Sequence, residues 1–144
     1  MQSELLGTWS LVSFELEMPD GTVHHPYGEA VEGYLVYSDE GIMSAAFMSS
    51  ERAAGGDQDL AATGSTGNYD AFMAYSGPFR IEGDRVAHDV EVSSMGAWTG
   101  TVQERWFKID GDVLSLLTAP LSVGDEAPVG RLVWNRVKGK PSGQ

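Results

Sequence analysis

One segment of the sequence places a histidine among valines. If residues 85–92 form a strand, the two-residue period puts His88 on the same face as Val86, Val90 and Val92. An imidazole on an interior face is either a structural group hydrogen-bonded to a neighbour, or a general acid–base or ligand-orienting group in a cavity. The sequence leaves both interpretations open.

A second candidate for chemistry is Arg105, which would share a strand face with Gln103 and Phe107. A buried arginine is rare without a carboxylate or an anionic ligand. We therefore expect Arg105 either to pair with an internal carboxylate, such as Glu15 or Glu91, or to bind a ligand carbonyl, enolate or carboxylate.

Other polar and aromatic side chains could face the same interior. Tyr75 would share a strand face with Phe79, and its hydroxyl could orient a substrate. Trp98 lies on an irregular segment flanked by glycines, which predicts a position at the mouth of a cavity. The remaining candidates to bind a ligand are Ser13, Glu15, Tyr34, Phe47, Gln103 and Phe107.

Short strands separated by turn residues would position these side chains. The phrase apolar–acid–Gly–Asp–x–apolar occurs at 81–86 and again at 109–114, and it is typical of tight hairpins because glycine adopts positive φ. Two such hairpins in series favour an up-and-down meander. The expected strands are 8–17, 33–38, 42–48, 75–81, 85–92, 101–109, 113–118 and 131–137.

One stretch lacks any periodic apolar pattern. Residues 49–68 are rich in Gly, Ala, Ser and Thr, which predicts a long loop. We expect one helical turn at 59–62, and a short helix at 69–73 with Asn68 as its N-cap.

The first and last strands each carry a residue suited to closing the sheet. Trp9 follows Gly7 and Thr8, so a large indole could plug one end of a barrel. Arg136, near the other end of the chain, could cover that ring through a cation–π contact. If these strands pair, eight antiparallel strands close into a barrel with room for one small ligand. The prediction is an all-β, eight-stranded up-and-down barrel, as a single domain over 1–144.

Composition excludes several classes of function. The net charge of −12, from 21 acidic and 9 basic residues, disfavours nucleic acid and anionic membrane surfaces. Cysteine is absent, so thiol chemistry, disulfides and Cys-ligated zinc are excluded. His24 and His25 are consecutive, so on a strand they would point to opposite faces, and we expect no metal site. No nucleotide-binding or nucleophile-elbow motif occurs, which favours a site without a cofactor.

The N-terminal sequence has no signal-peptide pattern and no apolar run is long enough to span a bilayer, so we expect a cytoplasmic monomer or homodimer.

An ordered set of short motifs resembles the bacterial and fungal lipocalin-like domain proteins, relatives of the lipocalins within the calycin group. The resemblance implies an eight-stranded barrel with an internal cavity, and related barrels include both ligand carriers and cofactor-free enzymes. It extends over nearly the whole chain, and its motifs are GTWSLVSF at 7–14, GYLVY at 33–37, MSA at 43–45, H-x-V-E from 88, W-x-G from 98, Q-x-R-x-F from 103 and L-x-W-x-R from 132.

Three functions remain open on the sequence. The first is a barrel that binds one small, largely apolar organic molecule. The second is a cofactor-independent cyclase or isomerase acting on a natural-product or polyketide-like intermediate, in which His88 transfers protons, Arg105 stabilises an enolate or carbonyl, and Tyr75 and Gln103 orient the substrate. The third is a packed barrel with no cavity that acts through surface contacts.

Overall fold

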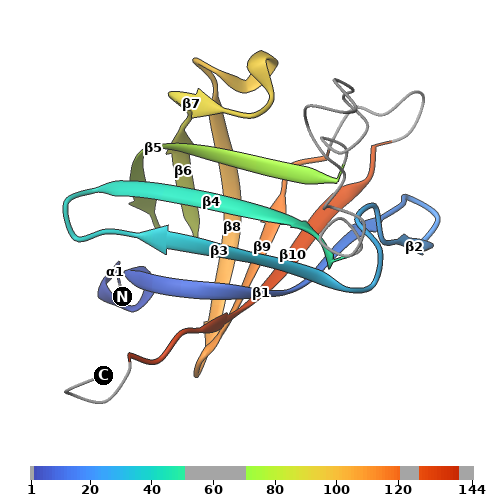
Figure 1. The fold of residues 1–144 in the computed structure, drawn as a ribbon, viewed down its shortest axis with the longest axis horizontal. Coiled ribbons are helices and arrows are strands. Elements are labelled where there is room, and N and C mark those ends of the chain that lie inside the picture. Colours follow the sequence, from blue (N-terminus) through green and yellow to red (C-terminus); the bar gives the residue numbers. More distant parts are fainter. Residues whose placement is uncertain (1, 51–70, 121–126, 140–144) are drawn as a thin grey trace, which may run out of the picture.

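Eight antiparallel strands form a closed barrel in the computed structural model, which describes residues 2–50, 71–120 and 127–139 (Figure 1). Two strands of two residues each, β2 (Val23–His24) and β7 (Val92–Ser93), add to β1 and β5. Helical structure in the described part includes α1 (Gln2–Leu5) and the 3₁₀ helix η2 (Gly96–Trp98). The barrel strands are β1 (Gly7–Glu17), β3 (Val31–Tyr37), β4 (Ile42–Ser49), β5 (Phe72–Glu82), β6 (Arg85–Asp89), β8 (Val102–Asp110), β9 (Val113–Thr118) and β10 (Val129–Arg136).

The topology is an up-and-down meander that closes on itself. Each barrel strand pairs with the next barrel strand along the chain, and β10 returns to pair with β1, beside which it lies in Figure 1. Closure removes the free edges that an open sheet would expose for pairing with other chains. The predicted all-β barrel and its closure between first and last strands are confirmed.

One end of the barrel is sealed by its first and last strands together with α1. Trp9 and Arg136 are cross-strand partners, and the guanidinium carbon of Arg136 lies 4.2 Å from the centroid of the Trp9 ring. The Trp9 indole N–H donates to the Leu5 carbonyl at 3.0 Å, and Arg136 donates to the carbonyls of Leu6 at 3.2 Å and Glu4 at 2.6 Å. The large indole is therefore fully buried with its polar atom satisfied.

The two repeated turn phrases form the predicted hairpins. Residues 83–84 connect β5 to β6, and residues 111–112 connect β8 to β9. The first residue of each turn is glycine, with φ of 65° at Gly83 and 62° at Gly111. Residues that carry a Cβ rarely adopt this left-handed backbone conformation.

The predicted short helix at 69–73 is wrong in its described part. Phe72 and Met73 begin β5 and pair with Met48 and Phe47 of β4. Met73 is buried in the core by this pairing, and tertiary packing of this kind outweighs a local capping signal. Residues 69–70, the helical turn at 59–62 and most of the predicted loop at 49–68 lie outside the described residues; Ser49 is the last residue of β4.

The predicted strand at 85–92 is interrupted. β6 ends at Asp89, the Glu91 N–H donates to the Ser76 carbonyl, and Val92 belongs to β7 with its side chain 67% exposed. Gly77 permits this crossing, since a Cβ there would lie 1.7 Å from the carbonyl oxygen of Asp89. His88 and Val90 share the interior, as predicted, whereas Val92 does not.

A β-bulge changes which residues of β1 face inward. Leu11 pairs with Trp134 but Ser13 pairs with Val133, so Val12 is an additional residue in β1. Residues after the bulge exchange faces, and Phe14 points inward in place of Ser13.

Candidate functional site

The barrel encloses a cavity of about 380 Å³ with predominantly apolar walls. This volume is within the range of small-molecule sites in proteins and excludes the packed barrel without a cavity. The lining residues are Phe14, Tyr27, Leu35, Ala45, Phe47, Met73, Tyr75, Met95, Trp98, Arg105, Leu116, Thr118, Leu132 and Trp134.

The segment from β7 to η2 forms part of the cavity wall. Trp98 lines the cavity from η2, and the exposed Met95 lines it from the residue before η2. The Trp98 ring packs edge-on against the Tyr75 ring, with 5.4 Å between centroids. Because Met95 touches both cavity and solvent, this segment borders the opening, consistent with the position predicted for Trp98.

Arg105 is the charged side chain in the described part of the wall. β8 carries it inward opposite Thr118 of β9, and only 6% of the residue is exposed. Its guanidinium donates to the Glu104 carbonyl at 3.0 Å and lies over the Trp98 ring, 5.7 Å from its centroid. Among the described residues, no carboxylate lies within ion-pair distance of Arg105, so neither Glu15 nor Glu91 is the partner that the sequence suggested.

Three buried side chains form a hydrogen-bonded series behind this wall. The Tyr37 hydroxyl lies 2.7 Å from His88 Nε2, and the Tyr75 hydroxyl lies 3.0 Å from His88 Nδ1. β3, β5 and β6 supply the three residues. Tyr75 lines the cavity, whereas His88, at 0% exposure, contacts Tyr75 but is not itself part of the lining.

Burial keeps the members of this series neutral. Desolvation, with the Arg105 charge as a second cause, lowers the pKa of His88 from 6.5 to about 3. Desolvation also raises the pKa of Tyr75, and it raises that of Tyr37 well above its ordinary value. The imidazole therefore has one N–H and one acceptor nitrogen at neutral pH.

The hydrogen-bond inventory favours one direction for the series. His88 Nε2 is the hydrogen-bond partner of the Tyr37 hydroxyl among the described residues, so the tautomer in which Tyr37 donates to Nε2 gives its buried proton an acceptor. In that tautomer Nδ1 carries the proton and donates to the Tyr75 oxygen. This arrangement leaves the Tyr75 O–H proton for an acceptor in the cavity.

Trp134 supplies a further donor. Its ring, 1% exposed, packs edge-on against Phe47 on the cavity wall. The buried indole Nε1–H has no hydrogen-bond partner among the described residues. Buried donors are normally satisfied, so this N–H, in a residue that lines the cavity, is an exception.

The structure brings together four of the predicted site residues at the cavity: Phe47, Tyr75, Trp98 and Arg105. The other predicted positions do not line it, and each has a structural reason.

Two predictions failed because of the bulge in β1. Ser13 does not line the cavity, since the additional residue at Val12 reverses the faces of β1. Glu15 lies on the outer face, where its carboxylate is 3.8 Å from Arg131 and 3.7 Å from His25.

Three further predictions fall on residues away from the cavity lining. Tyr34 is 60% exposed, because residues 35 and 37 of β3 point inward instead. The Gln103 amide donates to the Thr101 hydroxyl at 2.8 Å. Phe107 is partly buried against the core without reaching the cavity.

Several lining residues were not predicted from the sequence. Phe14 lines the cavity because of the bulge in β1, and Met73 lines it because β5 begins at Phe72. Alternation does identify Leu35 and Ala45, which are cross-strand partners on the inner face of β3 and β4. The same alternation in β10 places Leu132 and Trp134 inward.

Neither a metal centre nor a membrane-spanning helix is found in the described part of the chain. No group of three or more histidine or acidic side chains there could hold a metal ion. The helices described are too short to cross a bilayer.

Comparison with known proteins agrees with this architecture. Over 75 residues the chain is 37% identical to the 4'-hydroxy-3'-methoxypropiophenone carrier protein ppsC of Aspergillus oryzae, an alignment that covers 46% of this chain and 68% of that protein. A family model described as a lipocalin-like domain matches residues 6–137, from just before β1 to just after β10. The barrel, its cavity and a relative named as a carrier support small-molecule binding in the general sense. The chain belongs to the lipocalin-like domain family.

Proposed function

We propose that this protein binds and carries a small, largely apolar aromatic compound inside the barrel. The observation that carries the proposal is the cavity of about 380 Å³, whose walls are mainly hydrophobic and which has few polar groups. Sites of this composition gain affinity from apolar burial and orientation from a small number of hydrogen bonds. Phe14, Phe47 and Trp98 offer ring faces and edges to an aromatic ligand.

The name of the fungal relative supports an aromatic ketone as the ligand. A hydroxylated, methoxylated propiophenone has an apolar ring with several oxygen acceptors. The cavity offers matching donors at Tyr75, Arg105 and Trp134. We therefore take this compound as the first ligand to test.

The geometry favours binding over acid–base catalysis. His88 is separated from the cavity by Tyr75 in the hydrogen-bonded series, and a pKa of about 3 makes it a weak base. Burial raises the pKa of Tyr75 and of Tyr27, the two tyrosines of the described lining, so both remain protonated at neutral pH. The described wall therefore holds no side chain that would exchange protons with a substrate near neutral pH.

Titration of the full chain with 4'-hydroxy-3'-methoxypropiophenone tests the proposal, with matched variants on β4. Ala45 lines the cavity, whereas its neighbour Ala46 is exposed on the outer face. Ala45→Leu fills part of the cavity and should weaken binding by about tenfold or more, while Ala46→Leu should leave affinity unchanged. Calorimetry should give one ligand per chain, and circular dichroism should verify that both variants fold.

A second measurement on the unmodified protein does not depend on any variant. The chain has four tryptophans, whose indole N–H signals can be resolved by NMR. Ligand in the cavity should shift the signals of Trp98 and Trp134 and leave that of Trp9, at the sealed end, unchanged. Absence of saturable binding, or shifts confined to tryptophans outside the cavity, would contradict the proposal.

A further inference from the structure

The cavity wall contains a positive charge that the described residues do not neutralise. Arg105 is 6% exposed and has no carboxylate partner among them. The neighbouring carboxylate in sequence, Glu104, lies on the opposite face of β8 and contacts Arg85 at 3.3 Å. A guanidinium remains protonated in proteins, and burying it without an opposite charge costs considerable free energy.

The titratable groups that interact with Arg105 do not supply this opposite charge. They are Tyr75 from β5, His88 from β6 and Tyr37 from β3. Burial, first among the causes, raises the pKa of both tyrosines and lowers that of His88 to about 3. All three are therefore neutral across the physiological pH range, and the charge of Arg105 acts on the cavity without compensation from them.

Tyr75 and Trp134 carry hydrogen-bond donors in the described wall in addition to Arg105. The direction of the Tyr37–His88–Tyr75 series leaves the Tyr75 O–H available to the cavity. Trp134, which lines the cavity from β10, has an unpartnered indole N–H. Thr118, by contrast, uses its hydroxyl internally, since it donates to the Ala119 carbonyl at 2.7 Å and accepts from the Gly130 N–H at 2.8 Å.

We propose that the cavity selects the ionised form of an aromatic ligand, and that Arg105 and the Tyr75 hydroxyl hold a negatively charged oxygen on its ring. A neutral carbonyl oxygen would accept hydrogen bonds from the donors but would leave the buried charge of Arg105 unbalanced. An aryl oxyanion would accept the same hydrogen bonds and would also balance that charge. This inference rests on the proposed function, because it assigns the chemical form of the ligand bound in the same cavity.

The acidity of the protein does not oppose this assignment strongly. The net charge of −12 repels anions at long range. Charges on the outer surface are screened beyond about 8 Å at physiological ionic strength, whereas a guanidinium in a desolvated wall acts at contact distance. The local charge therefore decides which form is bound, and the surface charge decides mainly how fast it arrives.

The test uses two probes that differ by one methyl group, 4-hydroxypropiophenone and 4-methoxypropiophenone. The first ionises to a phenolate that absorbs at longer wavelength, and the second, its methyl ether, cannot ionise. Absorbance titration of the bound phenol against pH should give an apparent pKa about one to three pH units below that of the free phenol. The affinity for the methyl ether should stay constant over the same pH range.

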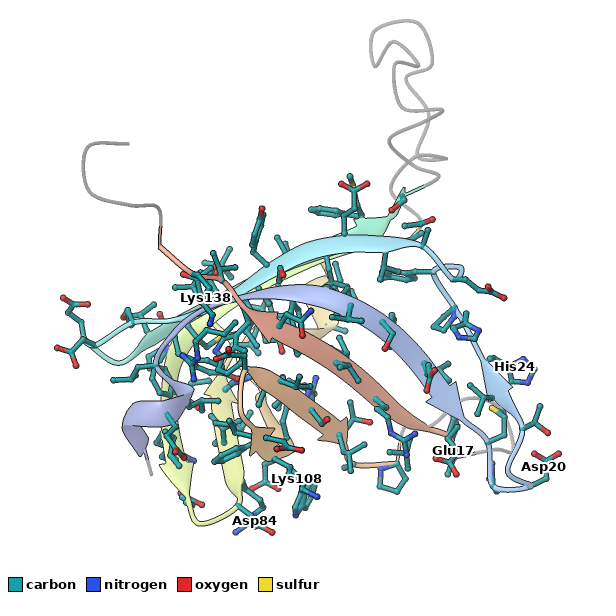
Figure 2. All side chains as sticks on the ribbon, turned by 90° about the horizontal axis from the view of Figure 1, so that it is seen from below. Glu17, Asp20, His24, Asp84, Lys108 and Lys138 are labelled. Carbon is teal, nitrogen blue, oxygen red and sulfur yellow. The ribbon has the colours of Figure 1, made fainter. Side chains whose placement is uncertain are left out.

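Variants of two positively charged residues on β8 test whether Arg105 lowers the pKa of the bound phenol. Arg105→Met removes the charge from the wall, so burial should then raise the pKa of the bound phenol above its free value. Lys108→Met removes one positive charge from β8 at an exposed position, at the periphery in Figure 2, and should behave like the unmodified protein. Because the methyl ether carries no charge, Arg105→Met should weaken its binding less than it weakens binding of the ionised phenol.

The outcomes separate this inference from the proposed function. If neither probe binds the folded protein, the proposed function fails. If both bind but the pKa of the bound phenol equals or exceeds that of the free phenol in the unmodified protein, the inference is wrong while the carrier function stands. If the lowered pKa persists in Arg105→Met, the assignment to Arg105 is overturned.

Discussion

Acidification should destabilise the barrel through His88. Burial, assisted by the Arg105 charge, lowers the pKa of His88 from 6.5 to about 3 in the folded protein. The unfolded chain takes up a proton on this imidazole below about pH 6.5, whereas the folded chain does not. Because the folded pKa is depressed, the stabilisation is complete above the unfolded pKa and is lost as the pH falls from 6.5 towards 3.

The magnitude follows from the difference in proton binding. Each pH unit in this window costs about 1.4 kcal/mol, so stability should decrease by about 2 kcal/mol between pH 7 and pH 5. The groups that face His88 are Tyr37 on β3, Tyr75 on β5 and Arg105 on β8. None of these groups changes its charge between pH 7 and pH 5, so His88 dominates the pH dependence of stability in this part of the barrel.

Urea unfolding at pH 7 and pH 5, followed by tryptophan fluorescence without added ligand, measures this effect. His88→Gln should be less stable at pH 7 by about 1–2 kcal/mol, because Gln replaces the two-sided hydrogen bonding only in part. Its free energy of unfolding should change by less than about 0.5 kcal/mol between the two pH values. His24→Gln is the matched control: His24 is exposed on β2 (Figure 2), so this variant should retain the loss of about 2 kcal/mol. An equal pH dependence in His88→Gln and the unmodified protein would refute the reasoning.

Two further substitutions test the fold itself. Arg136→Met should lower the free energy of unfolding by about 2 kcal/mol, since it removes the cation over Trp9 and its hydrogen bonds to α1; an unchanged urea midpoint would contradict this role. Gly77→Ala should cost about 2 kcal/mol or more, because the added Cβ would overlap the Asp89 carbonyl. Gly96→Ala is its control, with nothing within 4 Å of the added Cβ, and calorimetric melting should show it within about 0.5 kcal/mol of the unmodified protein.

Much of the fold could be predicted because it depends on local signals. The turn phrases around Gly83 and Gly111 specify hairpins by backbone conformation alone, and hairpins in series leave few topologies other than a meander. Trp9 and Arg136 then indicate which strands close the barrel. Alternation in β8 correctly placed Arg105 on an inner face, and its rarity as a buried residue marked it for attention.

The site was less predictable because it depends on departures from regular strands. The additional residue at Val12 exchanges Ser13 and Glu15 for Phe14 on the inner face, and nothing in the local sequence signals a bulge there. Of the two alternatives for Arg105, pairing with Glu15 fails because Glu15 undergoes the same exchange of faces. The free N–H of Trp134 depends on the geometry of a packed wall, which alternation cannot supply.

Two arginine–tryptophan pairs make similar contacts, and we propose different roles for them, stability for Arg136 and ligand recognition for Arg105. At the sealed end, the guanidinium of Arg136 covers Trp9, donates to two carbonyls and lies 3.6 Å from the Asp112 carboxylate. In the cavity wall, Arg105 lies over Trp98 and donates to one carbonyl, with no carboxylate among the described residues. Within the described residues the charge of Arg136 has a carboxylate partner and that of Arg105 has none, although Arg105 is the more deeply buried of the two. On this proposal, burial and residue type do not distinguish the structural Arg136 from Arg105, whereas the inventory of their hydrogen-bond and ion-pair partners does.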